Sequence, residues 1–170
     1  MTAPGGVVHT ATLADPGATA AFGAALAAAL DAAGRAPLVV YLDGDLGAGK
    51  TALVRAILGA LGHAGRVPSP TYTLVEPYVL AGRTVLHADL YRLNSPAELD
   101  DLGLAESVAP GSLLFVEWPA RGGDRLPPAD LAVALTPQGA GRRVRVVGAS
   151  PAGASVVAAL APGGEGSKRP

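Results

Sequence analysis

The hydrophobic positions of this chain fall into short segments with two different periods. Segments that are continuously apolar, or that alternate between apolar and polar residues, predict β-strands. The predicted strands are Val7–Leu13, Pro37–Asp43, Tyr72–Leu80, Arg83–Tyr91, Ser112–Val116, Asp130–Leu135 and Arg142–Val147. The run Ser112–Val116 has almost no polar interruption, which is typical of a central strand covered on both faces.

The turn between two of these strands fixes their relative direction. Ala81-Gly82 is the whole connection between Tyr72–Leu80 and the next predicted strand. So short a link forms a β-hairpin, and the sheet therefore cannot be wholly parallel. Pro77 lacks an amide proton, which favours an edge position or an irregular segment for the first arm of the hairpin.

Apolar residues at helical spacing, together with helix start and stop signals, predict the helices. The predicted helical ranges are about 15–33, 52–61, 95–103 and 155–160. The first begins with Asp15-Pro16, a typical N-cap followed by proline at the first helical position. Ser95 and Glu98 have the spacing of a capping box.

Strands that alternate with helices indicate an α/β fold. A chain of 170 residues has the length of one domain, large enough to bury a core. We place this domain at residues 1–161. Residues 162–170 are rich in glycine and charge and carry little apolar surface, which predicts a disordered tail.

Composition and charge exclude several classes of function. With a net charge of −1, the chain lacks the excess of positive charge that strong binding to nucleic acid or anionic membranes would need. The chain has no cysteine, so disulfides and thiolate metal sites are absent. The N-terminus does not have the pattern of a signal peptide, and no apolar stretch is long enough to span a membrane. We therefore expect a cytoplasmic protein.

The stretch Gly44-Asp45-Leu46-Gly47-Ala48-Gly49-Lys50-Thr51 matches the P-loop pattern and lies between a predicted strand and a predicted helix. In this context glycines, backbone amides and the helix N-terminus together bind phosphate. Lys50 is expected to contact the β- and γ-phosphates, and the Thr51 hydroxyl to ligate Mg²⁺. The predicted ATP-binding residues are Asp45, Leu46, Gly47, Ala48, Gly49, Lys50, Thr51 and Ala52.

Mg²⁺ chemistry requires an acid near Thr51, at the end of a neighbouring strand. Glu117 follows the continuous apolar run, so we assign it to Mg²⁺, directly or through water. Asp89 ends a segment of alternating polarity, typical of an edge or half-exposed strand, and we assign it to orienting the attacking water. Asp89, Lys50 and Glu117 form the predicted catalytic set. For each acid, a solvated carboxylate at a strand end is the alternative interpretation.

The residues Ser69, Pro70, Thr71, Tyr72 and Thr73 lie between the P-loop helix and the next strand, where nucleotide-sensing loops occur. Their hydroxyls could become ordered around the γ-phosphate, which would make this segment a switch loop. From the residues alone, a structural turn is nearly as well supported.

Three other residues have two interpretations each. Trp118 lies either near the nucleotide or packed in the core. His87 would share a strand face with Asp89, although a hydrogen-bonded structural histidine is favoured. Arg121 is either a stabiliser of the transferring phosphoryl group or a surface arginine.

Four motifs occur in order along the chain: the P-loop, Ser69–Tyr78, His87–Leu93 and Val116–Pro119. In this order and spacing the chain closely resembles the TsaE (YjeE) family, small P-loop ATPases of bacterial tRNA threonylcarbamoyladenosine (t6A) synthesis. The resemblance covers about residues 10–148.

The resemblance implies a P-loop NTPase-like three-layer sandwich with a mixed, mostly parallel sheet that includes the β-hairpin. It implies that Thr51 and Glu117 hold Mg²⁺, that Asp89 is needed for ATP hydrolysis and that Trp118 lies near the nucleotide. The implied partners are a TsaB–TsaD pair that modifies adenosine 37 of tRNA, with tRNA contacted indirectly through that complex. ATP hydrolysis would be slow in the isolated chain and would support repeated turnover of the complex.

Other functions of a P-loop protein remain open on the sequence. A small-molecule kinase would use the same loop, but no insertion of lid size is present. A non-catalytic, nucleotide-gated interaction module would bind ATP without turnover. A GTPase is disfavoured because guanine selection normally requires an Asn/Thr-Lys-X-Asp motif, for which no lysine is available.

Overall fold

The computed structural model describes residues 6–70 and 72–160. Its helices and strands, in chain order, are β1 (Val8–Leu13), α1 (Pro16–Ala32), β2 (Leu38–Asp43), α2 (Lys50–Ala60), β3 (Val75–Leu80), β4 (Arg83–Asp89), η1 (Pro96–Asp101), β5 (Leu113–Glu117), η2 (Pro119–Arg121), η3 (Gly123–Arg125), β6 (Leu131–Gln138), β7 (Gly141–Gly148) and α3 (Pro151–Leu160), where η denotes a 3₁₀ helix. Thr71 and the predicted tail at 162–170 lie outside the described residues.

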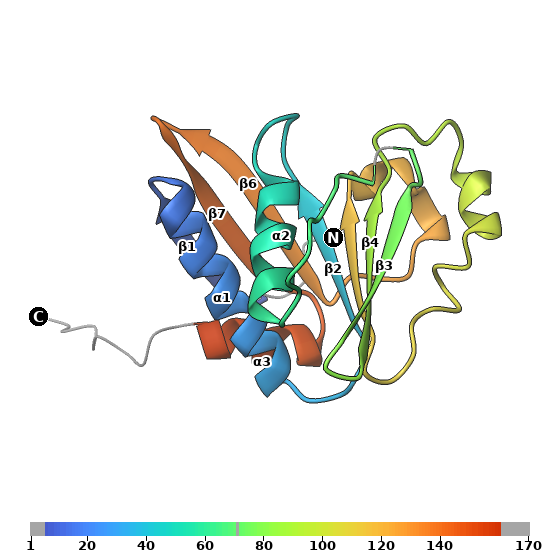
Figure 1. Ribbon diagram of the computed structural model, residues 1–170, viewed down its shortest axis with the longest axis horizontal. Helices are drawn as coiled ribbons and strands as arrows, with labels where there is room; N and C mark the ends of the chain where they lie inside the picture. The colour runs from blue at the N-terminus through green and yellow to red at the C-terminus, as the bar shows by residue number, and fades with distance from the viewer. Residues whose placement is uncertain (1–5, 71, 161–170) are drawn as a thin grey trace, which may run out of the picture.

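Within the described residues, the strands form one mixed sheet in the order β1-β7-β6-β2-β5-β4-β3 (Figure 1). Strand β2 pairs in parallel with β5 and β6, and β5 pairs in parallel with β4. The outer pairs β1–β7, β6–β7 and β3–β4 are antiparallel. The predicted α/β fold with a parallel centre and a β3–β4 hairpin is confirmed, and Pro77 lies on the edge strand β3.

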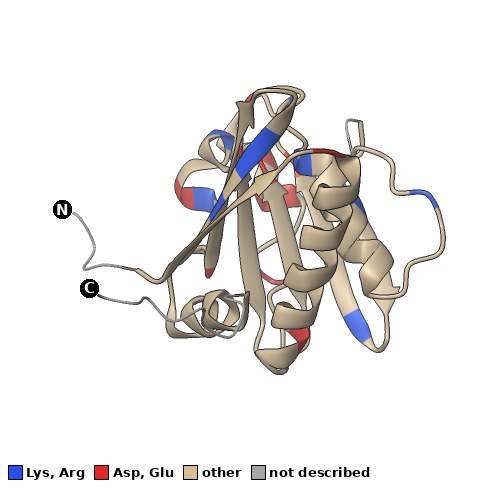
Figure 2. Ribbon diagram, turned by 90° about the vertical axis from the view of Figure 1, so that its left-hand side faces the viewer, with Lys and Arg blue, Asp and Glu red and all other residues tan. Residues whose placement is uncertain are grey.

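Helices α1 and α2 lie side by side on one face of the sheet (Figures 1 and 2). Their buried side chains, with those of α3, pack against Leu42 and Phe115 in the larger hydrophobic core. On the opposite face, Val39 and Val116 pack against Leu99 of η1 in a smaller core. One outer layer of the sandwich is therefore built from α-helices, whereas the other is built from 3₁₀ turns and loops.

Two of the predicted helix starts are confirmed by their caps. The Asp15 carboxylate accepts a hydrogen bond from the Ala18 amide at 2.7 Å and caps α1. Ser95 and Glu98 form both halves of the capping box, although the segment that they start is a 3₁₀ helix rather than an α-helix. None of the helices in residues 6–70 and 72–160 has the length and apolarity needed to cross a membrane.

Several element boundaries differ from the predictions. Strand β3 begins at Val75 rather than Tyr72, because Leu74 has a φ of 61° and breaks the extended conformation. Helix α3 begins at Pro151, four residues before the predicted start, since proline is well suited to a first helical turn. Strands β6 and β7 are longer than predicted and form a second hairpin, in which Gln138 pairs with Gly141.

The close contact between α1 and α2 yields a stability prediction. A Cβ atom added to Gly23 of α1 would lie 2.5 Å from the Cβ of Ala56 on α2, so Gly23→Ala should overpack this contact and destabilise the fold by about 1–3 kcal/mol. Gly59 lies exposed on α2 with open space around it, so Gly59→Ala should stabilise by about 0.5–1 kcal/mol. Urea unfolding of the two variants measures both effects, and changes of the same sign would contradict this packing.

Candidate functional site

A cavity of about 510 Å³ opens at the carboxyl ends of the central parallel strands. This is the edge at which open α/β sheets bind ligands, and the volume is typical of a small-molecule site. It is lined by Leu46, Gly47, Gly49, Lys50, Thr51, Ala52, Ser69, Asp89, Tyr91, Arg92, Glu117, Trp118 and Arg142. The lining thus brings together six of the eight predicted ATP-binding residues, the predicted catalytic set, one switch-loop residue and Trp118.

The P-loop wraps the N-terminus of α2, which begins at Lys50. Gly47 and Gly49 have φ angles of 81° and 104°, which are readily adopted only by glycine, and they turn the loop tightly into the helix. The first amides of a helix have no partner within it, so those of Lys50, Thr51 and Ala52 are available to an anion. Leu46 is 74% exposed at the mouth of the cavity, and Ala48 is buried beneath the loop.

Lys50 is buried and donates hydrogen bonds to backbone carbonyls of its own loop. Its Nζ bonds to the Gly44 oxygen and to the Asp45 oxygen, the latter at 3.0 Å. The same Nζ lies 4.2 Å from the centroid of the Trp118 ring. Trp118 borders the cavity beside the P-loop lysine, and it also packs on the smaller core.

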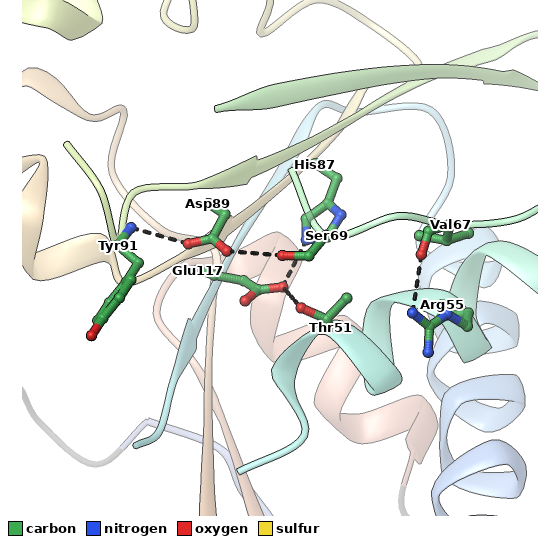
Figure 3. Close-up of polar contacts among 8 residues, drawn as sticks. All are labelled: Thr51, Arg55, Val67, Ser69, His87, Asp89, Tyr91 and Glu117. Atoms are coloured by element: carbon green, nitrogen blue, oxygen red, sulfur yellow. Dashed lines mark hydrogen bonds and ion pairs between the residues drawn. The ribbon is translucent and has the colours of Figure 1, made fainter. Parts of the chain in front are cut away.

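The carboxylate of Glu117 is the centre of a buried hydrogen-bond chain (Figure 3). Its Oε1 accepts from the Thr51 hydroxyl at 2.8 Å and lies 2.8 Å from the His87 Nε2. His87 is fully buried, as expected of a structural histidine, but its partner is the candidate catalytic carboxylate. The sequence favoured a hydrogen-bonded structural histidine, and the bond that His87 makes holds the Glu117 carboxylate in its orientation.

Asp89 lies beside Glu117, to which it is aligned in the β4–β5 register. One carboxylate oxygen accepts from the Tyr91 amide at 3.0 Å and the other from the Ser69 hydroxyl at 3.3 Å (Figure 3). The expectation of an edge or half-exposed position is wrong, because β3 pairs with the outer side of β4 and is itself the edge strand, and Asp89 is only 8% exposed. This burial raises the pKa of the Asp89 carboxyl above its ordinary value, and the bond from Tyr91 partly offsets that shift.

Among the described residues of the predicted switch loop, Ser69 lines the cavity. Ser69 contacts Asp89, whereas the Tyr72 ring is 88% exposed with the Arg92 guanidinium 5.3 Å from its centroid. Pro70 accepts the Leu74 amide at 3.1 Å, and Thr73 bonds to Glu76 at 2.8 Å. Thr71 lies outside the described residues.

Two arginines and one tyrosine of the site were not among the predicted site residues. Tyr91 and Arg92 follow Asp89 directly in the His87–Leu93 motif, and the motif itself was the signal that could have found them. Arg142 lines the cavity from the start of β7, far away in sequence, and no local pattern marks it. Arg121 does not line the cavity; its side chain is exposed and stacks 5.5 Å from the Tyr91 ring centroid.

The α/β sheet and its P-loop define a P-loop ATPase-type protein. The family model described as "Threonylcarbamoyl adenosine biosynthesis protein TsaE" matches residues 13–144. The chain belongs to the TsaE family, as its four motifs indicated.

Individual relatives agree with this membership. The chain is 42% identical over 123 residues to the tRNA threonylcarbamoyladenosine biosynthesis protein TsaE of Haemophilus influenzae, covering 72% of this chain and 78% of that one. The protein of the same name from Treponema pallidum is 38% identical over 98 residues, or 57% of this chain and 71% of that one. The crystal structure of Bacillus subtilis YdiB matches with a TM-score of 0.74 at 24% identity, over 93% of this chain and 97% of that one, which shows a shared fold.

The bond between His87 and Glu117 can be tested by a double-mutant cycle. His87→Ala and Glu117→Ala remove two ends of one hydrogen bond, so their effects on the free energy of unfolding should couple by about 0.5–3 kcal/mol. His63 packs against Tyr78 instead, so His63→Ala and Glu117→Ala should add to within about 0.5 kcal/mol. Urea unfolding measures both cycles, and additivity in the first would show that the bond contributes nothing.

Proposed function

We propose that this chain binds ATP with Mg²⁺, hydrolyses it slowly on its own, and serves as the ATP-hydrolysing subunit required for t6A modification of adenosine 37 in tRNA. The main observation in support of ATP hydrolysis is the 2.8 Å hydrogen bond between Thr51 of the P-loop helix and Glu117 at the end of β5. The link to t6A rests on membership of the TsaE family and on the names of its relatives in Haemophilus influenzae and Treponema pallidum.

The residues of the site fit a nucleotide phosphate chain. The amides at the start of α2 and the P-loop glycines form a cradle for the phosphates. Lys50 now donates to neutral carbonyl oxygens, and a phosphate oxygen would be a stronger, charged acceptor for the same ammonium group. Lys50 would therefore turn from its own loop to the β- and γ-phosphates.

The residues also fit Mg²⁺. No group of three or more histidine and carboxylate side chains suited to a metal occurs in residues 6–70 and 72–160. Mg²⁺ in nucleotide sites does not need one, since it is held by one or two protein oxygens together with substrate phosphates and water. Thr51 and Glu117 would supply those protein oxygens, with His87 fixing the carboxylate. The bound ion would neutralise charge on the β- and γ-phosphate oxygens.

Asp89 would act on water rather than on the metal. Its two oxygens accept from Ser69 and from the Tyr91 amide, so the carboxylate is held in a fixed orientation at the cavity wall. A water molecule between Asp89 and the γ-phosphate would donate to this carboxylate and present its lone pair to phosphorus. Ser69 would couple the arrangement to the predicted switch loop, which would become ordered when ATP is bound and relax afterwards.

The partner would be a TsaB–TsaD-type complex, with tRNA contacted through it. The net charge of −1 supports this division of roles, because it gives the chain no overall positive charge to attract tRNA. Hydrolysis by this chain would then reset the complex for another round.

Mutation should distinguish the roles of the two acids, Asp89 and Glu117. Asp89→Asn should keep ATP affinity within about twofold and lower the turnover rate by about a hundredfold or more, because only the orientation of water is lost. Glu117→Ala should instead weaken ATP binding in the presence of Mg²⁺ and leave Mg²⁺-free ADP binding unchanged. Calorimetric titration and a phosphate-release assay measure these quantities, with the exposed Asp101→Asn as the control. If both acid variants hydrolyse ATP at the parent rate, the assignment is wrong.

The t6A role should appear in cells and in reconstitution. A strain depleted of this protein should lose t6A from tRNA, and the parent gene should restore it, whereas Lys50→Ala should not. The ATPase rate should rise when TsaB and TsaD are added. Unchanged t6A and no stimulation would overturn the proposed role, phosphorylation of one added metabolite would favour a kinase, and ATP binding without turnover even with partners would favour a nucleotide-gated module.

A further inference from the structure

A side chain of α2 holds the connector that leads from this helix towards β3. Arg55 lies one helical turn after Thr51, and its Nη2 donates a 3.0 Å hydrogen bond to the Val67 carbonyl (Figure 3). Residues four apart share a helix face, so Thr51 and Arg55 make their contacts from the same side of α2. One face of the P-loop helix therefore meets both Glu117 and the connector.

The connector is stiff at the point where Arg55 holds it. In Val67-Pro68-Ser69-Pro70 each proline has a fixed φ, and the residue before each proline is restricted to extended conformations. The Val67 side chain is 4% exposed and packs in the larger core. With so few free rotations between them, a shift of the Val67 carbonyl would be passed on to Ser69, two residues further along the chain.

Ser69 is the residue at which the connector meets a candidate catalytic acid. Its hydroxyl donates to the Asp89 carboxylate at 3.3 Å, which is long for a hydroxyl donor, so a small displacement of Ser69 would break this bond. Beyond Ser69 the chain is fixed again: the Leu74 amide donates to the Pro70 carbonyl at 3.1 Å, and the Leu74 carbonyl accepts the Asp89 amide at 2.9 Å. The position of Ser69 therefore depends on how the connector is held before it.

Arg55 itself lies outside the nucleotide cavity. It is not one of the lining residues, and its side chain is on the exposed side of α2. It forms no ion pair within residues 6–70 and 72–160. Its printed contact is the one to Val67, so any effect of Arg55 on hydrolysis would pass through the connector.

We propose that Arg55 is a positioning residue for ATP hydrolysis. By holding the Val67 carbonyl, it keeps Ser69 against Asp89, and so keeps the Asp89 carboxylate oriented towards the attacking water. Because it acts from the helix that carries Thr51, it ties the connector to the same rigid element as the P-loop. Arg55 supports turnover and does not support nucleotide affinity. This assignment rests on the proposed ATPase function.

The first test compares turnover with affinity in the full chain. Arg55→Ala should lower the rate of phosphate release by roughly tenfold, because a hydrogen bond that orients the site is lost. The KM for ATP and the Kd for ADP should stay within about twofold, since the phosphate cradle is unchanged. Arg55→Lys should recover much of the rate, as one donor is enough for the Val67 carbonyl. Arg66→Ala removes an exposed arginine beside Val67 and should behave like the parent.

A double-mutant cycle tests the route through Ser69. Ser69→Ala should lower the rate of phosphate release by a factor similar to that of Arg55→Ala. The two changes together should lower it by less than about twofold beyond either one alone, because both act through one bond to Asp89. Independent, multiplying losses would overturn this route.

The second test does not depend on catalysis. Alanine is a better helix former than arginine, so Arg55→Ala does not weaken α2 itself. Amide hydrogen exchange at Leu74, which bonds to Pro70, should become faster in this variant. The Leu61 amide, which bonds to Ile57 near the end of α2, should exchange as in the parent. Amide exchange followed by NMR measures both.

Each contrary result has a distinct meaning. Parent-like turnover in Arg55→Ala would overturn the proposal and leave the proposed function in place. It would equally be overturned by a loss that Arg66→Ala reproduces, by one that Arg55→Lys does not relieve, or by ADP binding that weakens as much as turnover falls. Slower turnover with unchanged Leu74 exchange would rule out the route through the connector. A parent chain that hydrolysed no ATP, alone or with TsaB and TsaD, would refute the proposed function itself, while the exchange result would still decide whether Arg55 holds the connector.

Discussion

The parallel alignment of β2 with β5, and of β5 with β4, is the constraint on which the rest of the site depends. It brings the carboxyl ends of three strands to one edge of the sheet. The P-loop after β2, Glu117 at the end of β5 and Asp89 at the end of β4 therefore lie close together. The register places Leu42 and Asp89 on either side of Glu117. A slip of one residue in either pair would turn these side chains to the other face, away from α2.

This arrangement places polar groups inside an apolar core. Lys50, His87 and Glu117 are each less than a tenth exposed, in a molecule whose other buried residues are mostly valine, leucine and alanine. Burying such groups is unfavourable unless they are hydrogen-bonded, and here the Thr51–Glu117–His87 chain and the P-loop carbonyls provide the bonds. The His87 Nδ1 and the Arg142 Nη1 are left without a partner among the described residues. A third such atom, the Nη2 of Arg83, lies at the start of β4, at the opposite end of the sheet from the cavity.

Two of the three non-glycine residues with a positive φ in the described part of the chain lie beside the same site, and the third, Ala81, is in the β3–β4 turn. Trp118 has a φ of 56°, and Leu74 one of 61°, values that are uncommon for residues with a Cβ atom. Trp118 directly follows Glu117 and holds its ring beside Lys50, while the Leu74 carbonyl accepts the Asp89 amide at 2.9 Å. Both residues therefore sit next to a candidate catalytic acid, where the surrounding contacts hold conformations that the free chain would avoid.

The sequence by itself determined the elements whose signals are local. The P-loop, the Asp15 cap, the β3–β4 hairpin and the buried strand that ends in Glu117 each follow from adjacent residues, and so does membership of the TsaE family. Only the tertiary structure decided which groups share a cavity. The contact of Asp89 with Ser69, the contact of His87 with Glu117 and the approach of Arg142 to Gly49 join residues that are far apart in the chain. Such contacts are set by strand order and register, and neither periodicity nor composition encodes these in any single segment.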